Sequence, residues 1–142
     1  MNKWDTRFLD LAKYVAQWSK DTTKVGACVV AAGGKNQVAF GYNGFPPGIE
    51  DTEERLNTRE LKLIYVQHAE VNALDNAGFI VKGSTLYTTK FPCINCAKSI
   101  ISRGVKKVVT VTPDVNELNW GEESKYALHM FKEVGIILQF GK

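Results

Sequence analysis

The chain has 142 residues, of which 44% are hydrophobic and 23% charged, as expected for one globular domain rather than a disordered or fibrous chain. Its 18 basic and 15 acidic residues leave a net charge of +3, too small for the clustered basic surface of most nucleic-acid-binding proteins. Because the sequence lacks a long apolar run and starts with the polar stretch MNKWDTRFLD, we expect residues 1–142 to form a single cytoplasmic domain without a membrane partner.

The first third of the chain predicts a helix, two strands and a loop. Apolar residues recur at helical spacing between Trp4 and Ser19, which predicts an amphipathic helix. The apolar run from Val25 to Ala32 ends at two glycines and is followed by Val38–Tyr42, a pattern typical of two strands joined by a turn. The stretch Asn43–Gly48 contains two prolines and two glycines, and it therefore predicts a shaped loop.

The remaining chain predicts helices and strands that take turns. A charged segment, Glu50–Arg59, leads into the apolar stretch Leu61–Val66. Further along, helices are expected from His68 to Gly78, from Cys93 to Gly104 and from Glu122 to Glu133, and strands at 85–89, 105–111 and 136–140. Such alternation favours helices on both faces of a largely parallel sheet.

A pair of cysteines points to a metal. Cys93 and Cys96 are three residues apart at the expected start of a helix, where both side chains share one face and the helix N-terminus favours thiolates. The pair alone could also be a redox couple or two buried residues. His68 opens another expected helix, so these three residues could bind one zinc ion and leave a fourth position for water. Glu70 would then be the proton shuttle.

These residues carry a family resemblance. His68-Ala69-Glu70, followed later by Pro92-Cys93-Ile94-Asn95-Cys96, resembles the motif of the zinc-dependent cytidine and deoxycytidylate deaminase superfamily. Four more stretches resemble deoxycytidylate (dCMP) deaminases, so the similarity spans nearly the whole chain: KVGACVV (24–30), GYNGFPPG (41–48), TLYTTKFPC (85–93) and WGEESKYALHMFKEVGI (120–136). The resemblance implies a three-layer α/β/α sandwich with a central five-stranded mixed, mostly parallel sheet, one catalytic zinc ion per subunit, and a homo-oligomer, usually a hexamer.

The resemblance also implies a reaction. Zinc bound by His68, Cys93 and Cys96 would lower the pKa of its water to roughly 7, so that hydroxide can attack C4 of the cytosine ring. Glu70 would protonate N3 and then the departing amine. The expected activity is hydrolysis of dCMP to dUMP and ammonia, a step toward dTTP, with dCTP and dTTP as allosteric effectors.

The family resemblance also implies which residues bind the substrate. By this resemblance, the Ala69 N–H would bind the base carbonyl, Asn43 would bind a sugar hydroxyl, and Val25 would pack against the ring. A phosphate needs a cation. The expected phosphate ligands are Lys24 and Lys90, chosen from a set that also holds Arg55, Arg59 and Lys125. Trp120 could close over the base or the phosphate, or could serve only in packing.

Other functions stay open. A bifunctional dCMP and dCTP deaminase, a tRNA adenosine deaminase or a riboflavin-pathway deaminase would share the metal motif. A non-catalytic zinc-stabilised module would instead need a fourth protein ligand and would not need Glu70. If the source is a virus, the expected location is the cytoplasm of its host.

Overall fold

The computed structural model describes residues 1–113 and 121–141 of the chain. Within them, the helices and strands are α1 (Lys3–Ala16), β1 (Gly26–Val30), β2 (Val38–Tyr42), α2 (Glu53–Asn57), α3 (Arg59–Tyr65), α4 (Ala69–Ala77), the 3-10 helix η1 (Gly78–Val81), β3 (Thr85–Thr88), α5 (Ile94–Ser102), β4 (Lys107–Val111), α6 (Gly121–Val134) and β5 (Ile137–Gly141). None of the helices in these residues is long and apolar enough to span a membrane.

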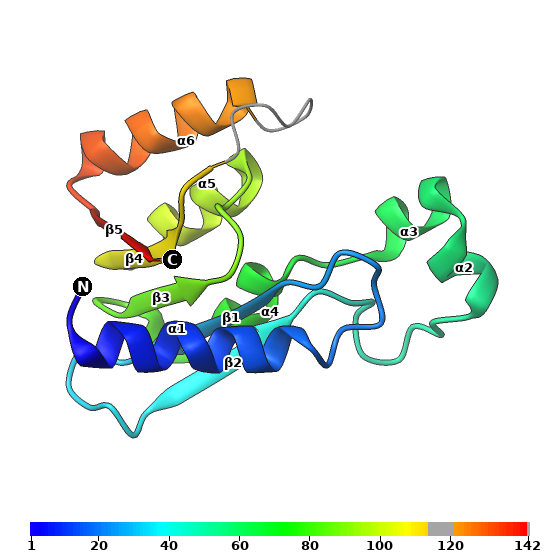
Figure 1. The fold of residues 1–142 in the computed structure, drawn as a ribbon, viewed down its shortest axis with the longest axis horizontal. Coiled ribbons are helices and arrows are strands. Elements are labelled where there is room, and N and C mark those ends of the chain that lie inside the picture. The colour runs from blue at the N-terminus through cyan, green and yellow to red at the C-terminus, as the bar shows by residue number, and fades with distance from the viewer. Residues whose placement is uncertain (114–120, 142) are drawn as a thin grey trace.

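The described strands form a five-stranded mixed sheet in the order β2-β1-β3-β4-β5 (Figure 1). Strand β1 is antiparallel to both of its neighbours, β2 and β3, whereas β3 pairs with β4, and β4 with β5, in parallel. The expected five-stranded mixed sheet is therefore confirmed. It is mostly parallel in the sense that four strands share one direction and only β1 runs against them.

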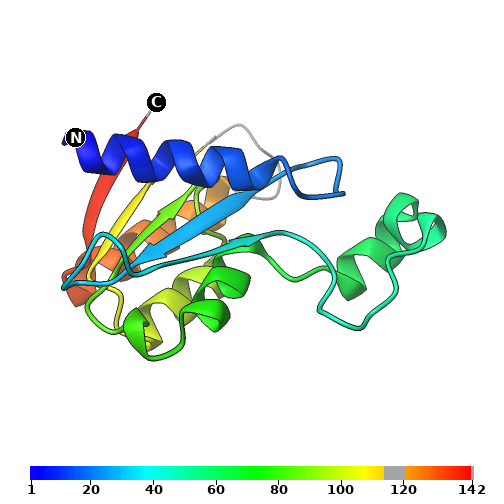
Figure 2. The ribbon, with the colours of Figure 1, turned by 90° about the horizontal axis from the view of Figure 1, so that it is seen from below.

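Helices cover both faces of the sheet, as the three-layer prediction requires (Figure 2). Side chains that alternate along β1 divide the core: Cys28 and Val30 pack with α1, whereas Ala27 and Val29 face α4, α5 and α6. This alternation is the normal period of a strand buried on both faces. Cys28, expected in the core, is fully buried.

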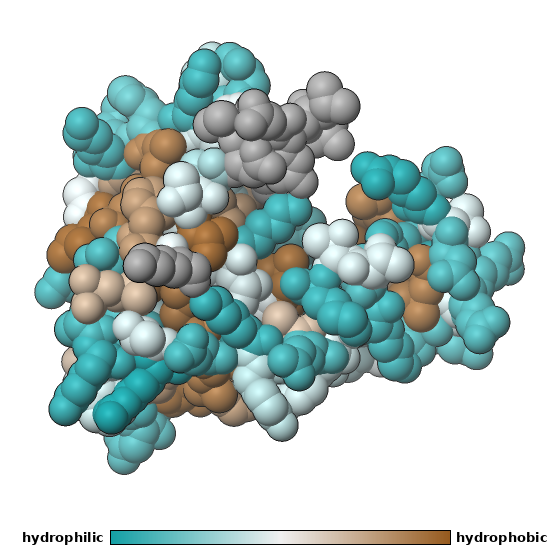
Figure 3. All heavy atoms as spheres, in the orientation of Figure 1, coloured by the Kyte–Doolittle hydropathy of each residue, from teal (hydrophilic) through white to brown (hydrophobic). Residues whose placement is uncertain are grey.

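Helices α2 and α3 form an arm that projects from this body (Figures 1 and 2). Thr52 caps α2, since its side chain accepts a hydrogen bond from the Arg55 N–H. Neither helix contains a buried residue, and hydrophilic side chains cover most of the visible face of the arm (Figure 3). After α3, the chain rejoins the body through a pair of backbone hydrogen bonds between Gly44 and Gln67, 2.8 and 3.1 Å long.

Two carbonyls on the outer edge of β2 accept hydrogen bonds from side chains of α4. The backbone hydrogen bonds from Asn43 to Val25 and from Ala31 to Gln37 set the alternation of the β1–β2 ladder, which leaves the carbonyls of Phe40 and Tyr42 on the free edge. Asn72 donates to the Tyr42 carbonyl and Asn76 to the Phe40 carbonyl, each at 2.8 Å. These asparagines are one helical turn apart, so a single face of α4 satisfies both groups.

We expect Gly41→Ala to destabilise the fold by about 1–3 kcal/mol, because overpacking at a close contact carries a cost of this order. A Cβ at this position of β2 would overlap with backbone atoms of Ala69 and Ala73, so α4 would have to move away from the sheet. Urea unfolding measures the loss. Gly33→Ala is the matched control, since a Cβ there meets nothing within 4 Å. Equal stability of both variants would contradict the close approach of α4.

Candidate metal centre and active site

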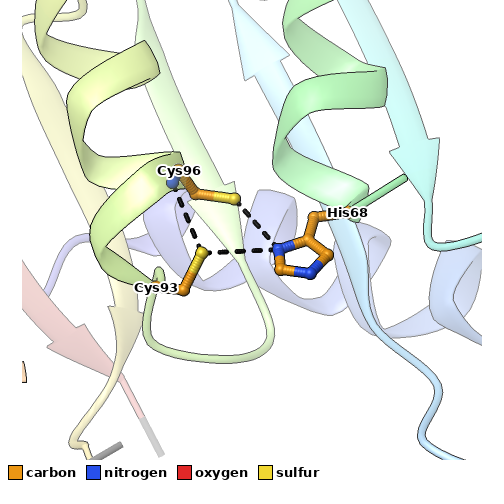
Figure 4. Close-up of side chains that lie close together, drawn as sticks. All are labelled: His68, Cys93 and Cys96. Atoms are coloured by element: carbon orange, nitrogen blue, oxygen red, sulfur yellow. Dashed lines mark hydrogen bonds between the residues drawn. The ribbon is translucent and has the colours of Figure 1, made fainter. Parts of the chain in front are cut away.

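Two helix N-termini bring a histidine and two cysteines together. His68 is the N-cap residue of α4, and Cys93 is the N-cap residue of α5, with Cys96 in the first turn of that helix. Figure 4 shows the three side chains pointing toward one another from the ends of these two helices. The predicted meeting of two helix N-termini is confirmed.

The distances within this cluster suit a zinc ion. The ligand atoms of His68, Cys93 and Cys96 all lie within 4.8 Å of one another. The Nδ1 atom of His68 is 3.2 Å from the Cys96 sulfur and 3.4 Å from the Cys93 sulfur. A tetrahedral zinc ion with bonds of about 2.0 Å to nitrogen and 2.3 Å to sulfur holds such ligand atoms roughly 3.5 to 3.8 Å apart. The donor set and its spacing therefore fit zinc, with Nδ1 as the nitrogen ligand.

Proton sharing between the two cysteines favours one thiolate. A hydrogen bond with Cys96 is the main cause that lowers the pKa of Cys93 to about 4. The same interaction, together with burial, raises the pKa of Cys96. A hydrogen bond with Cys93 raises the pKa of His68. The cluster thus holds protons between its ligand atoms, and a divalent cation would displace them.

Glu70 has the properties of an acid–base group. It lies in the first turn of α4, is only 4% exposed, and lines the same cavity as His68. Burial is the main cause that raises the pKa of Glu70 to about 7. A carboxyl group with such a pKa can both accept and donate a proton near neutral pH, which a shuttle requires.

The cavity that contains His68 and Glu70 has a volume of about 570 Å³. Val25 precedes β1, Asn43 follows β2, and Lys90 follows β3 by two residues. Because β1 is antiparallel to β2 and β3, all three residues lie at the same end of these strands. All three line the cavity, and so does Ala69, the first residue of α4. Four of the six expected substrate-binding residues therefore line the cavity that contains His68 and Glu70.

The other two expected residues are Lys24 and Trp120. The ammonium group of Lys24 donates to the backbone carbonyl of Ser19, and Lys24 does not line the cavity. Trp120 lies outside the described residues. Asn43 is a special case, because its Oδ1 accepts from the Val25 N–H at 2.9 Å and its Nδ2 donates to the Thr23 carbonyl at 2.7 Å. Its amide therefore fixes the loop before β1, with one N–H and one lone pair to spare.

The structure adds wall residues that the sequence did not suggest. Phe91 follows Lys90 in the cavity wall and is only 4% exposed. Asp21 and Thr23 line the cavity from the loop between α1 and β1. The arm also contributes a wall, through Arg59, Lys62 and Leu63 of α3 together with Val66. Of the arm residues, only Arg59 was considered from the sequence. Lys62, Leu63 and Val66 could have been found from their helical spacing from Arg59.

Comparison with known proteins places the chain in a family. Residues 2–112 match the cytidine and deoxycytidylate deaminase zinc-binding region. Deoxycytidylate deaminase of Mus musculus is 38% identical over 94% of this chain and 77% of its own length. An uncharacterized deaminase of Aliivibrio fischeri is 36% identical over 96% of this chain and 92% of its own length. The dCMP deaminase of cyanophage S-TIM5, solved in complex with dCMP and dUMP, superposes with a TM-score of 0.73 at 27% identity, covering 99% of each chain. The chain belongs to the zinc-binding cytidine and deoxycytidylate deaminase family.

Proposed function

We propose that this enzyme hydrolyses dCMP to dUMP and ammonia, with zinc bound by His68, Cys93 and Cys96. The observation that carries the proposal is the buried Glu70, which lines one cavity with His68 of the three-residue metal centre. A structural zinc site would be closed by a fourth protein ligand, and the described residues group only these three as candidate ligands. The deoxycytidylate deaminases among the relatives support dCMP as the substrate.

Glu70 moves the protons of this reaction. When bound, zinc would supply the Lewis acidity that makes water nucleophilic at neutral pH. The ionised Glu70 accepts a proton from the water that attacks C4 and delivers it to N3 of the ring. It then transfers the second proton, from the new C4 hydroxyl, to the amine. The C–N bond breaks, ammonia leaves and the uracil ring remains, so that one water is consumed for each ammonia released.

In this scheme, residues at the ends of β1 and β2 and at the start of α4 bind the base and the sugar. Ala69 lies at the N-terminus of α4, where backbone N–H groups have no partner inside the helix and can donate to the base carbonyl. Val25 is held by Asn43 through its backbone N–H, so its side chain offers a fixed apolar contact for the ring. The spare donor and acceptor of Asn43 would bind a sugar hydroxyl.

Two properties stay predictions from the family resemblance. They are assembly into a homo-oligomer, a hexamer, and control by dCTP and dTTP. Mass measurement by light scattering tests the first, and the rate of ammonia release from dCMP with and without dCTP or dTTP tests the second.

The proposed activity predicts a substrate profile for the zinc-loaded protein. Ammonia release is expected with dCMP and is expected to be at least about 100-fold slower with cytidine and with cytosine in single-stranded DNA, because loss of charge-assisted contacts to a phosphate is worth this order of magnitude. Comparable turnover of dCTP would make the enzyme bifunctional. Zinc binding without release of ammonia from any of these substrates would contradict the proposal and favour a non-catalytic module.

A further inference from the structure

The inner face of α3 forms a wall of the cavity rather than part of the core. Arg59, Lys62, Leu63 and Val66 are spaced at i, i+3, i+4 and i+7, so they lie along one side of the helix and its continuation. All four line the cavity that contains Glu70. In most surface helices such a stripe is apolar and packs in the core, yet α3 has no buried residue. Its inner face is therefore available to a ligand.

Lys62 is held in place at this wall. Its ammonium group lies 3.0 Å from a carboxylate oxygen of Asp21, and the two side chains are only 16% and 7% exposed. The Asp21 carboxylate also accepts a hydrogen bond of 2.9 Å from the Thr23 N–H, and the Asp21 N–H donates to the Ser19 hydroxyl at 3.1 Å. The loop before β1 thus fixes the carboxylate, and the carboxylate fixes Lys62.

A fixed ammonium group still has donors to offer. An ammonium group carries three N–H bonds, so the pairing with Asp21 leaves two for another acceptor. Arg59 lies one helical turn before Lys62 and adds a planar guanidinium with five N–H donors that suits phosphate oxygens. Preorganised cations bind an anion more tightly than free ones, because less side-chain entropy is lost on binding.

Among the cations that line the cavity, Lys90 lies close enough to Glu70 to oppose the rise that burial causes in its pKa, whereas Arg59 and Lys62 lie on α3. The wall runs from Arg59 and Lys62 on α3 through Val66 to His68 and Glu70 at the start of α4. The cytosine ring is uncharged and must reach the catalytic end near Glu70. A phosphate monoester carries about two negative charges at neutral pH, and α3 presents cations at the other end of the same wall.

We propose that Lys62 and Arg59 of α3 bind the 5′-phosphate of the nucleotide, and that Asp21 is the positioning residue for Lys62. This inference rests on the proposed function, since it names the part of that site that selects a nucleotide over a nucleoside. It makes the arm an element of substrate specificity.

The test compares Lys62→Met and Arg59→Gln with wild type, and uses Lys98→Met, an exposed lysine of α5, as the matched control. Calorimetry measures binding of dUMP and deoxyuridine to the zinc-loaded proteins, and ammonia release gives kcat and KM for dCMP and deoxycytidine. We expect each cavity variant to lower dUMP affinity and kcat/KM for dCMP by about 10- to 100-fold, mainly through KM. Deoxyuridine binding and kcat/KM for deoxycytidine are expected to stay within about threefold of wild type.

Asp21→Asn tests the positioning role. We expect a rise in KM for dCMP with an unchanged kcat and an unchanged KM for deoxycytidine, because only the phosphate contact depends on where Lys62 lies. A merely structural role would lower the melting temperature and affect both substrates alike, which would overturn the assignment of Asp21.

Failure of this inference differs from failure of the proposed function. If wild type deaminates dCMP but Lys62→Met and Arg59→Gln keep its preference over deoxycytidine, the phosphate site is wrong and the activity stands. If no cytosine substrate is turned over, the activity is wrong, and dUMP binding still decides the phosphate site. Equal wild-type affinity for dUMP and deoxyuridine would overturn the phosphate site outright.

Discussion

Glu70→Gln is expected to reduce kcat for dCMP by about 100- to 10,000-fold while the protein still binds one zinc ion per chain. The substitution keeps the size of the side chain but removes the group that carries protons between water, ring nitrogen and amine. Because Glu70 is only 4% exposed, bulk water cannot easily replace it as a shuttle. Steady-state kinetics and elemental analysis for zinc measure the two halves of this expectation on the same sample.

Glu122→Gln is the matched control for this variant. The side chain of Glu122 is 80% exposed on α6, so its carboxylate should matter little to the reaction. A Glu70→Gln enzyme with kcat near that of the control would remove Glu70 from the mechanism. A variant that loses zinc would instead show that the carboxylate supports the metal centre itself.

Cys96→Ser is expected to abolish zinc binding and to lower activity by at least about 1,000-fold, because the Lewis acid would be lost together with its ligand. Bound zinc should also stabilise the folded wild type, since a ligand that binds only the native state raises its stability. We therefore expect a chelator to lower the melting temperature of wild type but to leave that of Cys96→Ser unchanged. Calorimetric scans with and without EDTA make this comparison.

Cys28→Ala separates the metal effect from the loss of any buried cysteine. Cys28 is fully buried in the core, and burial raises the pKa of its thiol to about 12, so it stays protonated and is no metal ligand. This variant should lose stability yet keep both its zinc and its response to the chelator. Full zinc content in Cys96→Ser, or loss of zinc in Cys28→Ala, would refute the ligand assignment.

Most of the regular elements outside the arm were predictable because they have a helical or strand period in the sequence. Helix α4 begins at Ala69 and ends before Gly78, as expected, since a glycine with a φ of 59° can adopt a conformation that most residues avoid. Strands β2 and β3 were likewise expected within a residue of their observed bounds. The order of the strands was not predicted, because periodicity carries no information about which strands pair; the resemblance implied only a five-stranded mixed sheet.

The metal centre was predictable from the spacing of its residues in the sequence, whereas the proposed phosphate site was not. The spacing of Cys93 and Cys96 indicates metal ligands, and His68 was the histidine at an expected helix start. Lys62 and Asp21 are far apart in the sequence, and their 3.0 Å contact exists only once the arm and the loop before β1 lie against the cavity. Helix α3 was also hard to recognise, because its inner stripe mixes cations with apolar residues and lacks the pattern of a core helix.

The asparagine face of α4 also bears on the tendency of the protein to aggregate. An uncovered edge strand invites pairing with another chain, which is the first step of edge-to-edge aggregation. Asn72 and Asn76 occupy the outward carbonyls of β2, and the same helix starts with His68 and Glu70. Helix α4 therefore both brings Glu70 to the cavity and occupies hydrogen-bonding groups on the β2 edge of the sheet. A molecule in which α4 is docked for catalysis thus also offers fewer hydrogen-bonding groups for strand pairing at this edge.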